Sequence, residues 1–267
     1  MLRAFSSDNH DHTLGVTRAL SLSDCFWLKL AHEEVSFEEI TPYFAATPLQ
    51  GGFSPLSNPL KDCPKSGSCP DFGGASLATL FVNGAANKRW INSHTLLKVG
   101  SYKEYAPYEL CTALGLQHIS QASLAPEGLV LTNFTSTEVF LESMAQSGVV
   151  SADEHSREVA VSLFGELAVA LFVIDYLVEH DDRHSGNYGF LRSTSTGEYL
   201  SMAPFYDFDW AWSGAIVDLP KLAWEKHGSY ICNLCHRALT DARHIDYYDI
   251  ISKRANELLH TCPGSEE

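Results

Sequence analysis

Basic residues are scarce in this sequence. It has 18 Lys and Arg against 33 Asp and Glu, a formal net charge of −15, and the few bases are scattered without forming a run. A chain with this balance repels a phosphate backbone on average. We therefore do not expect nucleic acid as a partner.

Long apolar runs are also missing. The longest, LAVALFVI at 167–174, lies between Glu166 and Asp175 and falls well short of the ~20 residues that a membrane span needs. The first residues, MLRAFSSDNHDHTLG, lack the apolar core of a signal peptide. These absences predict a cytoplasmic protein that does not cross a membrane.

A disulfide framework is not expected. The seven cysteines are an odd number in a chain of 267 residues that is 45% hydrophobic and large enough to form its own core, so reduced thiols are favoured. Residues 232–236, CNLCH, match the Cys-x-x-Cys-His form of haem attachment, and Cys63 with Cys69 would add thiolates to a zinc site. Haem attachment requires export, which the N-terminus does not indicate, so free thiols on a helix are the favoured interpretation of Cys232 and Cys235.

The chain divides into segments of different composition. Residues 42–74 are crowded with Pro, Gly and Ser and predict irregular surface structure, so we interpret 1–71 as an N-terminal segment that packs on the rest of the protein. Residues 72–135 predict a small β-rich domain with one helix, and 136–267 predict a mainly helical domain. The predicted fold class is therefore α+β.

The individual elements follow from periodicity and turn residues. The spacing of apolar residues predicts a helix over 102–116 that stops near Gly115. Residues 157–178 are apolar nearly all round, which predicts a helix surrounded by other protein. Short apolar runs between turn residues predict strands at 76–84, 88–92, 94–100 and 128–134, the first three antiparallel.

Unpaired polar side chains follow this second helix directly, in VIDYLVEHDDRHSGNYGFL at 173–191. A loop fixed to a rigid buried helix is a common place for catalytic groups. Further along, Asp207 lies among aromatic residues, where a carboxylate is costly unless a cation or a donor meets it. An amide oxygen and a carboxylate oxygen suit Mg²⁺, so Asn187 and Asp207 are the predicted metal ligands. Asp182 is the predicted group that orients or deprotonates an attacking hydroxyl.

The first part of the chain offers groups that can hold phosphates. Residues 83–88, NGAANK, form a small-residue loop whose backbone can approach a triphosphate closely. Lys98, in TLLKVG, is expected to point inward or across a cleft. Glu104, near the start of the following helix, is the nearest carboxylate along the chain that can hold this lysine in place.

These segments resemble a known family. DYLVEHDDRHSGNYGFL followed by SMAPFYDFD is similar to the catalytic and metal-binding segments of HipA-like serine/threonine kinases, which have an Asp-Arg-His-x-x-Asn loop and a Pro-x-(Phe/Tyr)-Asp segment. Upstream, SLSDCFWLK, CPDF, NGAANKRW, TLLKVG and YKEYAPYELCTALGL follow in the family's order, so the resemblance covers about 20–210. It implies a two-lobed protein-kinase-like fold with a small β-rich N-lobe and a larger, mainly helical C-lobe.

The resemblance also implies a role for each matching residue. Asp182 corresponds to the catalytic base, Asn187 and Asp207 to the magnesium ligands, Lys98 to the α/β-phosphate lysine and Glu104 to its partner. In addition, Gly84 and Lys88 match the family's Gly-x-x-x-Lys phosphate loop, which is a less specific pattern.

Two departures from the family limit what is carried over. The chain is too short for the separate N-terminal domain of the larger members, so their toxin-like partnerships need not apply. A serine that some relatives use for inhibitory self-phosphorylation is missing from Asn83 to Lys88, although Ser76 lies upstream, so self-phosphorylation is left open.

Structural interpretations stand beside these roles. Asp182 and Asn187 are residues that also cap helices and close turns, and Arg183 is expected to satisfy carboxylates and carbonyls around the loop, as is His184. Asp209 is expected to be a turn residue, with a second metal contact as the alternative. Lys98 and Glu104 have solvated alternatives, and Glu109 is an alternative to Glu104.

The sequence therefore predicts an ATP- and Mg²⁺-dependent kinase that acts on a hydroxyl, with serine or threonine of a protein as the leading acceptor. Two alternatives are a catalytically degenerate kinase-like protein that binds a nucleotide or a partner, and a lipid or small-molecule kinase. A metal or haem protein built around Cys232 and Cys235 is a third, less favoured one.

Overall fold

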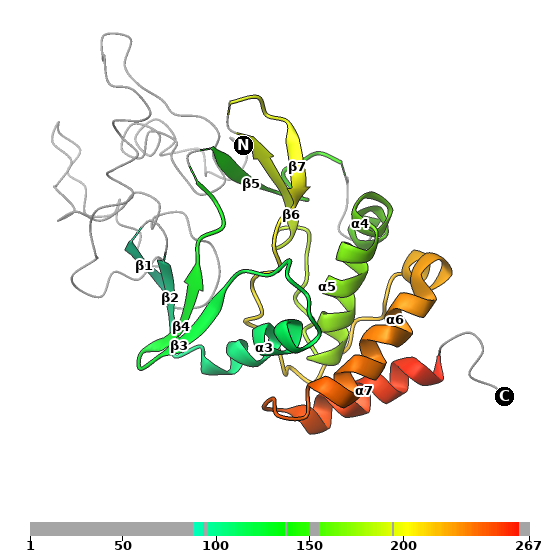
Figure 1. Ribbon diagram of the computed structural model, residues 1–267. Helices are drawn as coiled ribbons and strands as arrows, with labels where there is room; N and C mark the ends of the chain where they lie inside the picture. The colour runs from blue at the N-terminus through cyan, green and yellow to red at the C-terminus, as the bar shows by residue number, and fades with distance from the viewer. Residues whose placement is uncertain (1–87, 93–94, 137, 150–154, 194, 262–267) are drawn as a thin grey trace, which may run out of the picture. The chain divides into compact units, whose positions relative to one another are not determined.

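The computed structural model of the protein describes residues 88–92, 95–136, 138–149, 155–193 and 195–261 (Figure 1). Over these residues the protein has the α+β fold that the sequence predicts, with several helices and two small antiparallel sheets. One sheet has four strands in the order β1-β2-β4-β3, and the other has three in the order β5-β6-β7. Gly84, the loop up to Asn87, and the strand expected at 76–84 lie outside the described residues.

The four-stranded sheet confirms three of the predicted strands. β1 pairs with β2 and β2 pairs with β4, both antiparallel. Its members are β1 (Lys88–Asn92), β2 (Thr95–Val99), β3 (Ala122–Ala125) and β4 (Gly128–Thr132).

The helix predicted over 102–116 is present in two parts. The 3₁₀ turn η3 (Tyr102–Glu104) leads into α3 (Tyr105–Ala113). Gly115 has a φ of 63°, a left-handed backbone that glycine adopts without a steric penalty, and it ends the helix as predicted.

The long helix predicted over 157–178 is interrupted, and on this point the prediction is wrong. The structure has α4 (Ser156–Phe164) and α5 (Glu166–Leu177), separated by Gly165 with φ 57° and ψ −128°. The uninterrupted apolar pattern hides this break because Gly165 is the only residue that marks it. The expected burial is confirmed, since every residue from Ala168 to Asp175 is at most 2% exposed.

The helical part packs around α5. This helix contacts α4, α6 (Lys221–Asp241) and α7 (Tyr248–His260), as the bundle in Figure 1 shows. Each fully buried apolar side chain contributes roughly 1.5–3 kcal/mol, so the α5 core is a rigid base for the segment that follows it. None of the helices in the described ranges is both long and apolar enough to cross a membrane.

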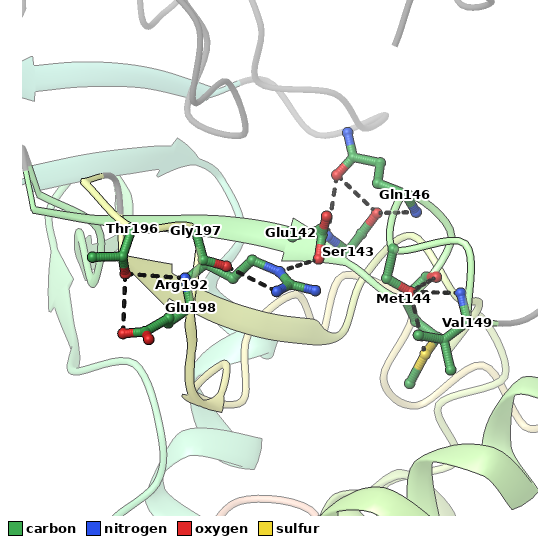
Figure 2. Close-up of polar contacts among 10 residues, drawn as sticks. Glu142, Ser143, Met144, Gln146, Val149, Arg192, Thr196, Gly197 and Glu198 are labelled. Carbon is green, nitrogen blue, oxygen red and sulfur yellow. Dashed lines mark hydrogen bonds and ion pairs between the residues drawn. The ribbon is translucent and has the colours of Figure 1, made fainter.

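Strands also occur where the sequence predicts mainly helix. They are β5 (Val139–Ser143), β6 (Gly189–Ser193) and β7 (Tyr199–Met202). Figure 2 shows Arg192 of β6 paired with Glu142 of β5, while its Nη1 donates to the Gly197 carbonyl at 3.0 Å. Such cross-strand contacts between distant segments stabilise strands too short for a clear period in the sequence.

The chain forms two compact units that are discontinuous in sequence. Unit 1 comprises residues 1–100, 123–142 and 191–200, and unit 2 comprises 101–122, 143–190 and 201–267. These divisions differ from the domains 1–71, 72–135 and 136–267, which stay predictions.

Candidate active site

The chain turns sharply after α5 and before its polar loop. Glu179 has a left-handed backbone with φ of 52°. The His180 N–H donates to the Asp175 carbonyl at 2.8 Å, and the Trp212 N–H donates to the Val178 carbonyl at 2.7 Å. The start of the loop is thus held both by α5 and by the segment that follows Asp207.

Arg183 connects the loop to α5 and to the Asp207 segment. Its Nε and Nη2 donate to the two carboxylate oxygens of Asp175 at 3.0 and 2.9 Å. Its Nη1 donates to the carbonyls of Asn187 at 3.1 Å and Tyr206 at 2.7 Å. The side chain is buried, and its guanidinium lies over the Phe208 ring, 4.9 Å from the centroid. The structural role predicted for Arg183 is confirmed.

In the described part of the chain, the side-chain nitrogen of Asn187 has a hydrogen-bond partner and its side-chain oxygen has none. Its Nδ2 donates to the Asp182 carbonyl at 2.6 Å, which fixes the orientation of the amide. Its Oδ1 is buried and accepts no hydrogen bond within the described part of the chain. A buried amide oxygen without a donor costs free energy, and a hard cation is one partner that removes the cost. The residue fits the metal-ligand role predicted for it.

The Asp207 segment is held on both sides of that residue. Phe205 forms a bridge to Ile119, in which the Phe205 N–H donates to the His118 carbonyl and the Ser120 N–H donates to the Phe205 carbonyl, both at 3.0 Å. Asp207 itself has a left-handed backbone with φ of 62°, an uncommon conformation for a residue with a side chain. Backbone strain of this kind concentrates at functional sites.

Three carboxylates gather around this segment. One oxygen each of Glu104, Asp207 and Asp209 lies within 4.8 Å of the others, a spacing that a metal ion can bridge. Glu104 is 1% exposed, and its Oε1 accepts a hydrogen bond from the Phe208 N–H at 3.1 Å. Asp209 does lie in a turn, as predicted, but its carboxylate also joins the cluster. The pairing of Glu104 with Lys98 stays a prediction.

The surroundings of His180 bring the predicted residues together. Burial, followed by the positive charge of Arg183, lowers the pKa of His180, while the carboxylates of Asp175, Asp207 and Asp182 act in the opposite direction. Asp182 and Asp207 are therefore both close enough to influence the same imidazole. Asp182 is also exposed, so its carboxylate is accessible to solvent.

Unit 1 buries two lysines side by side. Lys88 on β1 and Lys98 on β2 are directly opposite each other in the antiparallel pair, which places both side chains on the same face of the sheet. They are 5% and 2% exposed, so neither is the solvated lysine of the structural interpretation.

A glycine keeps the Lys98 strand in register. Gly128 opposes Val99 at the end of the β2–β4 pair and has a φ of 149°. A Cβ at this position would lie 2.1 Å from the Lys98 carbonyl oxygen and 2.7 Å from the Gly100 nitrogen. Any other residue would push β4 away from the strand that presents Lys98.

Asp175 and His180 are site residues that the sequence did not identify. Both are buried; Asp175 accepts hydrogen bonds from Arg183, and the charge of Arg183 helps to lower the pKa of His180. The single carboxylate within the otherwise apolar stretch 167–178 was the available signal for Asp175, because such a group requires a buried cation or donor. His180 gave no comparable signal in the sequence.

The CNLCH motif gives no support to a metal or haem site. Cys235 is a buried free thiol, as predicted, whereas Cys232 is disulfide-bonded, which corrects the prediction for that residue. Cys111 is free as well, so the partner of Cys232 lies outside the described residues. A sulfur engaged in a disulfide does not supply a thiolate ligand.

No family model and no curated protein matches the sequence. The solved structures that are similar to it include the following two. The proinflammatory kinase CtkA of Helicobacter pylori is 13% identical with a TM-score of 0.43, over 66% of this chain and 90% of CtkA. A chain from the Shewanella oneidensis MR-1 toxin–antitoxin complex of HipA, HipB and operator DNA is 12% identical with a TM-score of 0.41, over 68% of this chain and 64% of its own length.

Both TM-scores are below 0.5, so the roles of individual residues rest on the site itself.

Proposed function

We propose that this protein is an ATP- and Mg²⁺-dependent kinase that transfers the γ-phosphoryl group of ATP to a serine or threonine hydroxyl of a protein. The main support is the Arg183 bridge, which fixes the backbone of Asn187 next to that of the residue preceding Asp207. An amide and a carboxylate held in this way are the oxygen ligands that Mg²⁺ prefers beside a phosphate.

Asn187 and Asp207 would hold the metal, with Glu104 and Asp209 close to the Asp207 carboxylate. The bound metal would neutralise charge on the transferring phosphoryl group. Asp207 needs no rearrangement to serve as a ligand, because Glu104 and the Phe205 bridge already hold its neighbours. Such preorganisation is the main source of rate in phosphoryl transfer.

Asp182 would accept the proton of the acceptor hydroxyl while the hydroxyl oxygen bonds to the γ-phosphorus and the bond between that phosphorus and the β–γ bridging oxygen breaks, releasing ADP. Its exposed carboxylate can meet a large acceptor, and its carbonyl is fixed by the Asn187 amide and the His184 N–H. The base and a metal ligand are therefore connected by one hydrogen bond, which keeps the acceptor oxygen and the phosphoryl group in a constant relation.

Lys98 would bind the α- and β-phosphates and Lys88 would add a second positive charge to the phosphate site, with Gly84 in the same loop. The two-lobed arrangement with the nucleotide between lobes is part of this proposal. Glu104 would orient Lys98 while its other oxygen holds the Phe208 N–H.

The test is transfer of radiolabel from [γ-³²P]ATP with Mg²⁺ to casein and to the protein itself, with phosphoamino-acid analysis of the products. We expect phosphoserine or phosphothreonine from the wild type and loss of turnover in Asp207→Ala. Asp218→Asn is the matched control, because this aspartate is exposed and its described hydrogen bond is made by its carbonyl and not by its carboxylate.

Full Mg²⁺-dependent transfer by a folded Asp207→Ala protein would refute the metal assignment. Nucleotide binding without transfer to any acceptor would instead identify a degenerate kinase-like binding protein. Transfer only to phosphoinositide vesicles or to small hydroxyl compounds would replace the protein acceptor with a lipid or small-molecule one.

A further inference from the structure

Arg183 shares a single nitrogen between the two segments that bear the predicted metal ligands. Its Nη1 donates to the Asn187 carbonyl at 3.1 Å and to the Tyr206 carbonyl at 2.7 Å. Asn187 is itself a predicted ligand, and Tyr206 directly precedes Asp207. The separation of the two ligand-bearing backbones is therefore limited by the reach of one guanidinium nitrogen.

Asp175 prevents this guanidinium from moving. Both of its carboxylate oxygens accept hydrogen bonds from Arg183, at 3.0 and 2.9 Å, and the two side chains are 1% and 2% exposed. Asp175 lies in the last turn of α5, whose residues from Ala168 to Asp175 are all buried. The bidentate pair thus connects the ligand segments to the rigid core.

The aromatic ring after Asp207 completes the arrangement. Phe208 is fully buried, lies under the Arg183 guanidinium at 4.9 Å, and has edge-to-face contacts with His180 at 5.9 Å and Tyr108 at 5.1 Å. Asp207 therefore has a residue contacted by Arg183 on each side of it in the sequence. Neither its backbone nor its left-handed φ can relax independently of the guanidinium.

A second buried ion pair in the same unit, formed by Arg254, makes different contacts from the Asp175–Arg183 pair. Arg254 of α7 donates from Nε and Nη2 to Glu179 and from Nη1 to Glu257, all of them side-chain carboxylates. It contacts no backbone carbonyl of a ligand-bearing segment in the described structure. Arg254 joins a helix to a loop, whereas Arg183 joins two candidate ligands to each other.

We propose that the Asp175–Arg183 pair is a positioning device that sets the affinity of the site for its divalent cation. The inference rests on the proposed function. Buried ion pairs contribute little net stability compared with apolar residues of the same volume, so a fold requirement alone does not explain the pair. Lysine cannot replace Arg183, because one ammonium lacks the planar fork that reaches a carboxylate and two carbonyls together.

The experiment measures Mn²⁺ binding to the full chain in the presence of a non-hydrolysable ATP analogue, by the loss of the free Mn²⁺ signal in electron paramagnetic resonance. Arg183→Lys and Asp175→Asn are compared with Arg254→Lys, a change in the buried pair whose described hydrogen bonds go to Glu179 and Glu257 and to neither candidate ligand. Circular dichroism and the melting temperature report whether each variant is folded. Initial rates over a range of Mg²⁺ concentrations then separate metal affinity from kcat.

We expect the Kd for Mn²⁺ to rise about 10- to 100-fold in Arg183→Lys and Asp175→Asn, as for other residues that orient metal ligands, and to stay within about twofold of wild type in Arg254→Lys. The Mg²⁺ concentration for half-maximal rate should rise in parallel. Unchanged Mn²⁺ affinity in a folded Arg183→Lys or Asp175→Asn protein would overturn this inference while leaving the kinase proposal intact.

Two further outcomes are decisive. Failure of both variants to fold would make the pair a requirement of the fold and would also overturn the inference. Failure of the wild type to bind Mn²⁺ with the nucleotide would refute the proposed function, and the inference with it. This outcome is distinguished from failure of the inference alone because it is seen in the wild type, without any variant.

Discussion

The two compact units each gather charges of one sign. Unit 1 places Lys88 and Lys98 opposite each other on one sheet face, and unit 2 gathers the carboxylates of Glu104, Asp207 and Asp209 within 4.8 Å. Both lysines and Glu104 are buried, whereas Asp207 and Asp209 are half-buried. In the proposed function, nucleotide phosphates would lie beside the first group and a divalent cation beside the second.

The units also differ in how their groups are fixed. The lysines depend on strand register, including the close approach of Gly128 to the Lys98 carbonyl. The carboxylates depend on hydrogen bonds between segments far apart in the chain, such as that from the Phe208 N–H to Glu104. Strand geometry is a repeating local property. Hydrogen bonds between distant segments, which hold the carboxylates, exist only in the folded protein.

The largest effect should come from removing the base of unit 2. Asp182→Asn removes the carboxylate that accepts the proton, and we expect the phosphoryl-transfer rate to fall by about 10²–10⁴-fold. Asp181→Asn is the matched control, since it removes the same charge from the neighbouring exposed residue. Steady-state rates at saturating ATP and Mg²⁺ measure both, and an equal loss in the two variants would show that only net charge matters.

A smaller effect should distinguish the two lysines of unit 1. Lys98→Met should lower kcat/KM for ATP by about 10²-fold, because one donor to charge in the transition state is lost. Lys88→Met should mainly raise KM for ATP, by roughly tenfold, because the second lysine adds a general positive charge rather than a specific contact. The opposite ranking would transfer the specific role from Lys98 to Lys88.

The smallest effect concerns the pH dependence of stability through His180. Burial, and after it Arg183, lowers the pKa of His180 in the folded protein, so the unfolded chain takes up a proton first as the pH falls through about 6.5. The stability contributed by neutral His180 is present above that pH and is lost below it. Urea unfolding measures the free energy of unfolding at pH 7.5 and at pH 5.5. The difference between these two free energies should be about 1 kcal/mol smaller in His180→Gln than in the wild type.

The control for this measurement is His236→Gln, a change at an exposed histidine of α6. The comparison uses the difference between the two pH values within each protein, so a general loss of stability cancels. A pH dependence in His180→Gln equal to that of the wild type would show that His180 has no part in it.

Several elements were predictable because their determinants are local. The antiparallel strands at 88–92 and 94–100 are bounded by turn residues, and Gly115 marks the end of α3. The break at Gly165 was not, because a single glycine within an apolar pattern has little weight against its neighbours. The strands β5, β6 and β7 are stabilised by contacts between distant segments, which periodicity does not report.

The candidate site was predictable as a set of residues but not as a geometry. The sequence identified Asp182, Asn187 and Asp207, and the resemblance to HipA-like kinases gave each an expected role. It did not identify Asp175, and for Asp209 it favoured a turn residue over a second metal contact. Both depend on which distant groups approach them.

The sequence by itself determined which chemical groups are present and where helices and strands can form, because these depend on residue type and on spacing over a few positions. Only the tertiary structure decided that Arg183 would connect α5, the Asn187 loop and the Asp207 segment, and that Glu104 would lie beside Asp209. The physical reason is that a buried charge takes its partners from whatever the folded chain brings within hydrogen-bonding distance, however far apart they are in sequence.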